Sequence, residues 1–486
     1  MSLLALSGTN SVSGGYEIDN SCKFEDDNDE YLYRTNASGT NRKTWTVSWW
    51  FKQTELPSTR SSYVEHWQGG VYGEATRAGI DQYDRLWIDV GGGDGNTGTL
   101  FRSLSTARLR DTSAWYHVVI ACDSTQSTEA DRLKVWLNGV EVTSWDQHQI
   151  PTLNFQSALQ GTGGVVMKWG SYDATYNGYS GYLAECNYVD GVTATQNDFG
   201  EFDEDSGIWK PKEYTGSYGT NGSYLDFETA SDLGANAKGN DTNFSLSNIT
   251  AADQSVDSPT NNFATGNAVV YFSNPTFATF NPITEGGTKI TKGAGGWETL
   301  SSTIAVTSGK WYMEMQNISV PESAMMSVFP ADIEFLYQGG QINNYAGKVS
   351  GDGGISYYSY NGNVYQNAGN SSYGSTWANE TNTMAIALDM DNGKVYFARA
   401  NTWQNSGDPT SGSTGTGAID VLAPTKPHLI GYTPYAANTD GFINFGGYTG
   451  AAISSGESDA NGYGTFEYAP PSGYYALCTK NLEEFG

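Results

Sequence analysis

The stretch Thr44–Lys52, TWTVSWWFK, decides the fold of this chain. It alternates bulky apolar or β-branched residues with polar ones, which is the period-2 pattern of a strand buried on one face. Runs of the same kind follow it: RLWIDVGG (Arg85–Gly92), WYHVVIACD (Trp115–Asp123) and RLKVWLNGVEV (Arg132–Val142). Short spacing between such runs, with frequent turn signals, is typical of a β-sandwich.

The composition supports the same class. The chain has 486 residues, which is enough for two or three domains of ordinary size. It contains 59 Gly, 32 Tyr and 14 Trp. Glycine supplies turns with positive φ, and aromatic residues suit half-buried pleated surfaces. We therefore predict an all-β protein with many loops.

The net charge restricts the partners. The 25 basic and 53 acidic residues give a net charge of −28, which repels nucleic acid and anionic membrane surfaces. We expect no nucleic-acid partner and no membrane insertion, and we interpret the charge as a solubility feature of an exposed protein. Cation binding by carboxylate-rich loops is the alternative interpretation.

Cysteine usage and the N-terminal sequence indicate folding in a cytoplasm. Cys22, Cys122, Cys186 and Cys478 show no CxxC spacing, so the sequence contains no zinc or redox motif. Cys122 and Cys186 lie in predicted strands, and we expect them to be small buried hydrophobic residues. We find neither a signal-peptide pattern at the N-terminus nor an apolar stretch of transmembrane length.

The order of the strand-like runs resembles that of a laminin-G-like or concanavalin-A-like jelly roll. The resemblance is carried by WYHVV, then LKVWLNG, and then GYLAECNYVDG (Gly181–Gly191). It implies a sandwich that presents a curved sheet and rim loops to a ligand, often a sugar. We assign residues 1–231 to this domain.

Residues 232–267 are polar and poor in large apolar side chains, and we predict a polar linker or an extended strap packed on one domain. Residues 268–486 form a second β-rich region. It resembles a SPRY domain through GKWYME (Gly309–Glu314), a hairpin over Met384–Phe397 and NFG (Asn444–Gly446). The resemblance implies a second β-sandwich of a kind used for protein or ligand recognition.

Other segments resemble stretches that recur in phage structural proteins. They are DSPTNNFATGN (Asp257–Asn267), the YTGSYGTNGSYLDF segment and the C-terminal PPSGYYALCTKNLEEFG. The resemblance implies a virion component that is made in the host cytoplasm. We expect other virion proteins as partners, and a homo-oligomer or a repeated array.

These features together predict a phage virion surface structural protein without enzymatic activity. We expect a tail fibre, or a tail- or capsid-associated adhesin, that binds a host surface glycan or protein. The first alternative is a purely structural capsid decoration or tail assembly protein. The second, which we favour less, is a polysaccharide depolymerase.

The acidic motifs argue against catalysis and against a metal site. Glycoside hydrolases need two carboxylates that flank the scissile bond. The nearest pattern, EFDED (Glu201–Asp205), lacks the final Glu of a β-glucanase motif and lies among turn residues. DMDNG (Asp389–Gly393) has Ala400 where an EF-hand needs Glu, so we predict a hairpin turn. We expect no catalytic residue, no metal and no cofactor, with calcium at Asp26–Glu30 as the alternative.

Aromatic side chains on predicted loops are the candidates for sugar binding, because sugar rings stack their C–H faces on Trp and Tyr. The candidates are Trp67, Tyr72, Tyr83, Tyr172 and Trp403, together with Tyr176, Tyr345 and Tyr373. For any single ring, packing is the more frequent role. A cluster of three on one rim would reverse that expectation.

Overall fold

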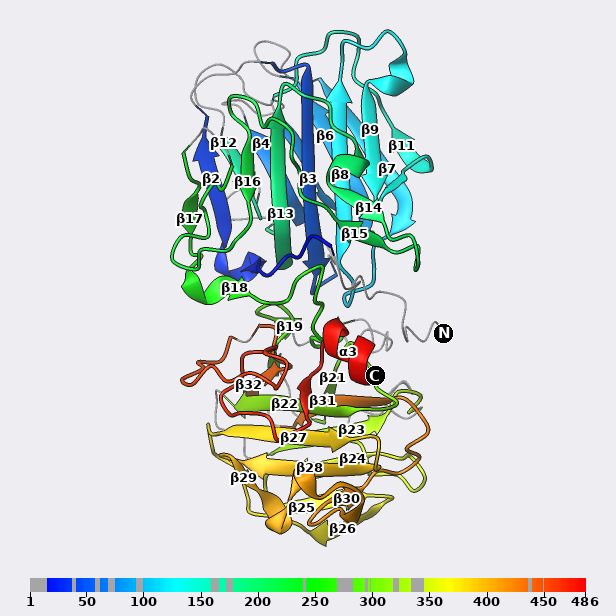
Figure 1. The fold of residues 1–486 in the computed structure, drawn as a ribbon, viewed down its shortest axis with the longest axis vertical. Helices are drawn as coiled ribbons and strands as arrows, with labels where there is room; N and C mark the ends of the chain where they lie inside the picture. Colours follow the sequence, from blue (N-terminus) through cyan, green and yellow to red (C-terminus); the bar gives the residue numbers. More distant parts are fainter. Residues whose placement is uncertain are drawn as a thin grey trace. The chain divides into compact units, whose positions relative to one another are not determined.

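A computed structural model gives the fold of the chain. It describes residues 15–36, 41–56, 62–68, 75–92, 99–158, 166–171, 178–238, 242–268, 283–292, 296–297, 299–317, 323–333, 345–435, 439–448 and 450–486. The chain divides into two compact units, one of which comprises Asn10–Asn261 while the other includes Asn262–Gly486. Both units are built from β-sheets, so the predicted all-β class with β-sandwich domains is confirmed (Figure 1).

The first unit is a sandwich of two antiparallel sheets, I and II. Sheet I contains, in order, β10 (Val140–Glu141), β9 (Leu133–Leu137), β8 (Tyr116–Asp123), β3 (Thr44–Gln53), β13 (Gly181–Asp190), β1 (Ser21–Phe24) and β18 (Gln254–Ser255), with β16 (Ser223–Leu225) also paired to β13. Sheet II contains β11 (Trp145–His148), β7 (Leu100–Arg108), β6 (Arg85–Gly91), β5 (Ala75–Ile80), β4 (Ser62–Gln68), β12 (Val166–Trp169), β2 (Tyr31–Thr35) and β17 (Ser245–Ser247). A separate ribbon pairs β14 (Gly200–Phe202) with β15 (Trp209–Pro211).

The strand β3 follows the predicted alternation, but both of its faces are buried. Trp45 and Trp49 belong to the hydrophobic core of the first unit. The alternate residues Ser48 and Lys52 point to the other face of sheet I and are also fully buried. The expectation of a single buried face is therefore wrong for β3, because residues 191–219 cover one part of the outer face of the sheet and Asp257 pairs with Lys52 on another part.

The predicted linker, residues 232–267, contributes strands to the first unit. β17 pairs with β2 at one edge of sheet II (Figure 1). β18 pairs with β1 at the edge of sheet I. The units divide between Asn261 and Asn262, which lies inside the segment 232–267. Most of this polar segment is thus a strap on the first sandwich, because edge pairing uses backbone groups and needs few apolar side chains.

A buried ion pair fixes this strap. The Asp257 carboxylate accepts a hydrogen bond from Lys52 Nζ at 2.7 Å and another from Trp115 Nε1 at 3.0 Å. The side chains of Lys52 and Asp257 are 0% and 1% exposed. Burial lowers the pKa of Lys52, and the adjacent Asp257 carboxylate opposes that shift. Loss of either partner would leave a charge in a dry interior.

The second unit is another pair of antiparallel sheets, III and IV, joined by one parallel bridge to the C-terminal segment. Sheet III contains β19 (Ile283–Thr284), β20 (Lys289–Lys292), β32 (Thr439–Asn444), β22 (Lys310–Asn317), β27 (Thr383–Asp389), β28 (Lys394–Arg399) and β29 (Thr402–Trp403), with β30 (Ile419–Asp420) paired to β28 and β33 (Tyr475–Ala476) paired in parallel to β22. Sheet IV contains β21 (Leu300–Ser301), β31 (His428–Pro434), β23 (Ala324–Pro330), β24 (Ile355–Tyr358), β25 (Asn363–Gln366) and β26 (Gly369–Ser372).

The hairpin turn predicted for the second unit is present in the structure. The DMDNG segment is the turn of the β27–β28 hairpin, in which the side chain of Asp389 accepts a hydrogen bond from the backbone of Asn392 at 2.9 Å. Gly393 takes φ of +61°, which glycine adopts without steric cost. The chain ends in α3 (Thr479–Phe485), a short helix that the sequence pattern did not predict.

The cysteines are packing residues. Cys22, Cys122, Cys186 and Cys478 are all buried free thiols. Cys22, Cys122 and Cys186 belong to the core of the first unit, so the predicted role of Cys122 and Cys186 as small hydrophobic residues is confirmed. Within the described residues, we find no helix whose length and hydropathy would let it cross a membrane.

Candidate functional site

The outer face of sheet I carries a second hydrophobic cluster, distinct from the sandwich core. Val119 of β8 and Val189 of β13 pack there against Phe199, Tyr214 and Tyr218 of the covering segment. The rings form a ladder: Phe199 stacks on Tyr214 with centroids 4.8 Å apart, and Tyr214 meets Tyr218 edge-on at 5.0 Å. This ladder holds the loop 213–219 against the sheet.

His117 lies on the same face as a neutral, fully satisfied side chain. Its Nδ1 accepts a hydrogen bond from Trp209 Nε1 at 3.0 Å, so the ring proton is on Nε2, which lies 2.9 Å from Ser48 Oγ. The ring stacks on Trp50 with centroids 4.6 Å apart. Burial lowers the pKa of His117 to about 3. Because Nε2 donates its proton, His117 is not placed to take a proton from Ser48.

A buried carboxylate lies beside the ladder, at an irregularity in β13. The pairing of β13 with β3 shifts register between Ala184 and Asn187, and Glu185 adopts φ of +51° there. The Glu185 carboxylate accepts hydrogen bonds from Tyr224 Oη at 2.5 Å and from Tyr16 Oη at 3.2 Å. Burial raises the pKa of Glu185 to about 7.

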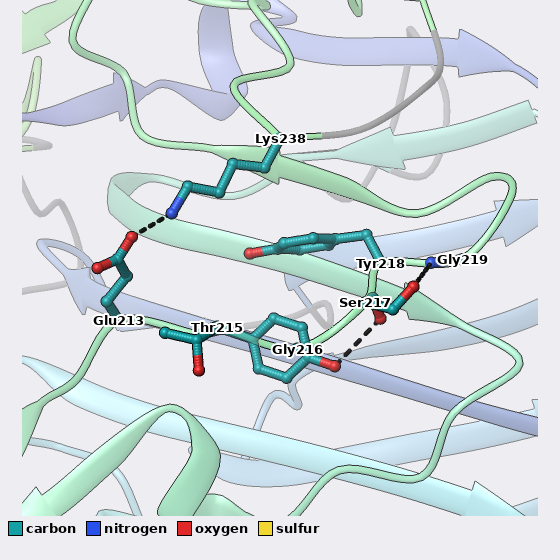
Figure 2. Close-up of a pocket in the computed structure, with 8 residues that line it drawn as sticks. Glu213, Thr215, Gly216, Ser217, Tyr218, Gly219 and Lys238 are labelled. Atoms are coloured by element: carbon teal, nitrogen blue, oxygen red, sulfur yellow. Dashed lines mark hydrogen bonds and ion pairs between the residues drawn. The ribbon is translucent and has the colours of Figure 1, made fainter.

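A pocket opens above this network. It has a volume of about 560 Å³ and is lined by Glu213, Tyr214, Thr215, Gly216, Ser217, Tyr218, Gly219 and Lys238. Figure 2 shows Glu213 and Lys238 facing one another as an ion pair on one side, with Tyr218 and Gly219 on the other. Lys238 Nζ also lies 5.7 Å from the centroid of the Tyr224 ring.

The pocket presents polar groups at its mouth and aromatic rings in its wall. Glu213, Thr215, Ser217 and Lys238 are exposed, whereas the Tyr218 ring is buried. Hydroxyl, carboxylate and ammonium groups at the mouth offer hydrogen bonds to a ligand rich in hydroxyl groups. The buried rings stabilise the loop and leave little ring surface for stacking.

Each side of the pocket is held in place by its own hydrogen bonds. Tyr218 Oη donates to Asn187 Oδ1 at 2.7 Å, and Tyr214 Oη donates to the Ser217 carbonyl at 3.2 Å. Asn236 Oδ1 accepts from the Tyr224 backbone at 3.0 Å, which holds the chain that leads to Lys238. The pocket is thus preformed by side-chain bonds.

Sequence reasoning missed this pocket. It treated YTGSYGTNG as a turn-rich connection, and its sugar-binding candidates lie elsewhere. The available signal was the pair of tyrosines in that segment, Tyr214 and Tyr218, each of which is followed by glycine within two residues. That pattern indicates a tight loop pinned by rings, but the position of Lys238 follows only from the three-dimensional fold.

The predicted sugar-binding aromatics do not form one site. Tyr83 is 53% exposed in the β5–β6 turn, where its ring lies beside the Arg85 guanidinium. Trp403 is half-buried in β29 and packs edge-on against Tyr396. Tyr373 is buried in the core of the second unit, so a binding role for it is wrong.

The remaining aromatic candidates divide between described and undescribed parts of the chain. Tyr345 is half-buried and belongs to an aromatic cluster of the second unit. The backbone of Trp67 pairs with Met167 in β12. The candidates Tyr72, Tyr172 and Tyr176 lie outside the described residues.

The acidic motifs are engaged by protein groups. Lys210 Nζ lies 3.4 Å from carboxylate oxygens of both Glu201 and Asp203. In the Asp26–Glu30 turn, Glu30 pairs with Lys23 at 2.9 Å. Among the residues that the structure describes, we find no group of three or more His, Cys, Asp or Glu placed to hold a metal ion.

One carboxyl group near that turn is strongly perturbed. Burial, together with the nearby Glu25, Asp27 and Asp26, raises the pKa of Glu55 to about 9. The group is therefore protonated at neutral pH, which removes one charge from a crowded acidic region. Whether calcium binds at Asp26–Glu30 stays a prediction.

One comparison with known proteins concerns the first unit. Residues 26–190 match the family model described as the Concanavalin A-like lectin/glucanases superfamily. No curated protein matches the chain.

Three similar solved structures are distant in sequence. The SPRY domain of human HERC1 covers 33% of this chain and 89% of its own, with 16% identity and a TM-score of 0.25. Domains LG4-5 of the mouse laminin alpha1 chain cover 88% of this chain and 86% of their own, with 9% identity and a TM-score of 0.30. A heptameric SAP-like pentraxin from Limulus polyphemus covers 38% and 82%, with 14% identity and a TM-score of 0.26. At these values we base function on the family match and on the pocket. The first unit has a concanavalin-A-like fold, and its residues 26–190 are similar to the superfamily of that name.

Proposed function

We propose that this protein is a phage virion surface protein, a tail fibre or a tail- or capsid-associated adhesin, that binds a glycan of the host surface without chemical turnover. The observation that carries the binding role is the preformed polar pocket of residues 213–219 and Lys238 on a lectin-type sandwich. Its exposed hydroxyl and charged groups suit sugar hydroxyls, and its loop is held in place by buried rings.

Further features support binding in preference to hydrolysis. Glu201 and Asp203 share Lys210 in a turn, where Asp203 Oδ1 also accepts from the Ser206 backbone at 2.8 Å. The buried Glu185 is occupied by two tyrosine hydroxyls. A carboxylate pair that flanks a glycosidic bond needs free access from both sides.

The virion assignment is supported by the resemblance of several segments to phage structural proteins and by the charge of −28. In this proposal other virion proteins and further copies of the chain are the partners. Many copies on one particle would convert weak single contacts into firm attachment through effective concentration. The protein is made in the host cytoplasm and resides in the virion.

An array of host cell-envelope glycans, probed with the full chain, tests the proposal. We expect retention of the folded protein and a roughly ten- to hundredfold loss of affinity in Lys238→Ala, since one hydrogen bond to a charged group contributes about 1.5–3 kcal/mol. Lys134→Ala is the matched control, because Lys134 forms an exposed pair with Glu141 at 3.0 Å away from the pocket. Absence of retention, or equal loss in both variants, would contradict the proposal.

A further inference from the structure

The second unit carries a group of partly exposed aromatic rings, which we call the aromatic platform. Its members are Trp297, Tyr345, Tyr358, Tyr360, Tyr365 and Tyr435. Trp297 is the hub, with ring centroids 5.3 Å from Tyr345, 5.4 Å from Tyr358 and 4.9 Å from Tyr435. Each of these contacts is tilted or edge-on, and none is a parallel stack.

The alternation of sheet IV directs part of the platform outward. In β24, Tyr357 points into the core and is fully buried, while its neighbour Tyr358 is half-buried on the opposite face. Tyr365 of β25 lies on that same face, 5.8 Å from Tyr358. Tyr360, in the turn between β24 and β25, lies 6.1 Å from Tyr358. Two strands and their turn therefore present rings on one surface.

Exposure is concentrated on this platform. Among the described residues of the second unit, the exposed large hydrophobic side chains are Val349, Tyr360 and Tyr435, and two of the three belong to the platform. Tyr360 is 64% exposed and Tyr435 is 39% exposed. Rings kept at the surface in one contiguous group indicate a binding surface.

The platform also carries hydrogen-bonding groups, which distinguishes it from a purely apolar patch. Tyr358 Oη bonds with Ser323 Oγ at 3.0 Å, and Tyr365 Oη accepts from Asn361 Nδ2 at 3.1 Å. After burial, the groups that raise the pKa of Tyr358 are the other tyrosines Tyr365, Tyr360 and Tyr435. Phenolic groups therefore surround Tyr358, and Lys348 Nζ lies 5.7 Å from the Tyr345 ring centroid.

We propose that the aromatic platform is a second glycan-binding site, specific for neutral polysaccharide chains, in addition to the pocket of the first unit. Sugar rings stack their C–H faces on tilted Trp and Tyr rings, while phenolic and amide groups bond the hydroxyls. A neutral chain is favoured because a protein of net charge −28 repels acidic polymers. The site goes beyond the proposed function and does not depend on the first unit.

Affinity gel electrophoresis of the full chain tests this site. The high negative charge drives the protein quickly through a native gel, so binding to an immobile neutral polymer appears as retardation. The probes are dextran, mannan, mixed-linkage β-glucan and galactomannan, with alginate as the acidic comparator. We expect retardation by at least one neutral polymer and none by alginate.

Variants separate the platform from the pocket. The double variant Tyr360→Ala/Tyr435→Ala removes two exposed rings and should weaken the apparent affinity about tenfold or more. Tyr83→Ala removes a matched exposed ring from the first unit and should change nothing. Thermal unfolding of each variant verifies that the fold is kept.

Defined outcomes would overturn the inference. Lack of retardation of the folded wild-type protein by every neutral polymer would do so, as would unchanged retardation in the double variant. Retardation that is lost in Lys238→Ala and kept in the double variant would assign binding to the pocket alone. Platform-dependent binding to host envelope protein whose glycans have been destroyed by periodate would instead assign the platform a protein ligand.

Discussion

The pocket of the first unit and the aromatic platform of the second unit use the same residue types in opposite ways. Tyr214 and Tyr218 are buried beside the pocket and leave polar groups at its mouth, whereas Tyr360 and Tyr435 stand exposed on the platform. Buried rings hold a loop in one conformation, and exposed rings offer stacking surface. Burial, and not the abundance of tyrosine, therefore separates structural from ligand-binding aromatics.

The largest expected effect on stability concerns the buried ion pair of the first unit, the unit that carries the pocket. Asp257→Ala removes the buried carboxylate that pairs with Lys52, and we expect the first unit to lose about 3–5 kcal/mol of stability. Chemical denaturation measures this loss. Glu141→Ala, which breaks an exposed pair with Lys134, should cost less than about 1 kcal/mol. Equal costs for the two variants would contradict the burial of the strap.

Each unit contains a buried glutamate of its own, and we therefore predict a similar pH dependence of stability in both units. Burial raises the pKa of Glu185 in the first unit to about 7, and that of Glu314 in the second unit to about 7. An acid with a raised folded pKa binds more protons in the folded state, so stability falls as pH rises from about 4.5 through 7. Each group contributes a loss of about 3 kcal/mol across that window.

Denaturation at pH 5 and pH 7.5 checks this dependence in each unit. Glu185→Gln should flatten the profile of the first unit and leave that of the second unit unchanged, and Glu314→Gln should do the reverse. The Glu314 carboxylate accepts hydrogen bonds from the backbone of Glu467 and Tyr468, both at 2.8 Å, which the amide of Gln can reproduce only in part. A stability that rises with pH between about 4.5 and 7 would contradict the raised pKa values of Glu185 and Glu314.

A single hydroxyl should distinguish a buried tyrosine from an exposed one. Tyr218→Phe removes the donor to Asn187 Oδ1, which is buried, and we expect a stability cost of about 1–3 kcal/mol. Tyr360→Phe changes an exposed ring and should cost less than about 0.5 kcal/mol. Thermal or chemical unfolding compares the two variants. Similar losses of stability in the two variants would contradict the distinction between structural tyrosines beside the pocket and exposed tyrosines on the platform.

A small effect on stability is also expected at the mouth of the pocket. Lys238 pairs there with Glu213, and both side chains are exposed. Lys238→Ala should lower stability by less than about 1 kcal/mol, because solvent screens an exposed pair. A larger loss in chemical denaturation would show that the pair maintains the fold rather than the ligand site.

The strands were predictable from the sequence because their signal is local. The runs at Thr44–Lys52 and Trp115–Asp123 became β3 and β8, and the Asp-Asn-Gly turn became the β27–β28 hairpin. Their alternation and turn chemistry are contained within ten residues. The prediction that only one face of β3 is buried was wrong, because the segments that bury the polar face are distant in the sequence.

The candidate sites were less predictable, for the same physical reason. The pocket requires Lys238 to meet a loop about twenty residues earlier, and the platform brings Trp297 to Tyr435 across the second unit. Such contacts depend on tertiary packing and leave no local pattern. Tyr345 was proposed from the sequence as a loop aromatic, but its partners followed only from the fold.

Hydrogen–deuterium exchange of the full chain, with and without the polysaccharide that retains it, tests the central claim most directly. Binding at preformed surface sites predicts slower exchange in peptides that cover residues 213–219 and 355–366, with the core strands β3 and β22 unchanged. Protection confined to residues 200–211, or no protection while the polysaccharide is bound, would contradict the assignment of these surfaces as the glycan sites.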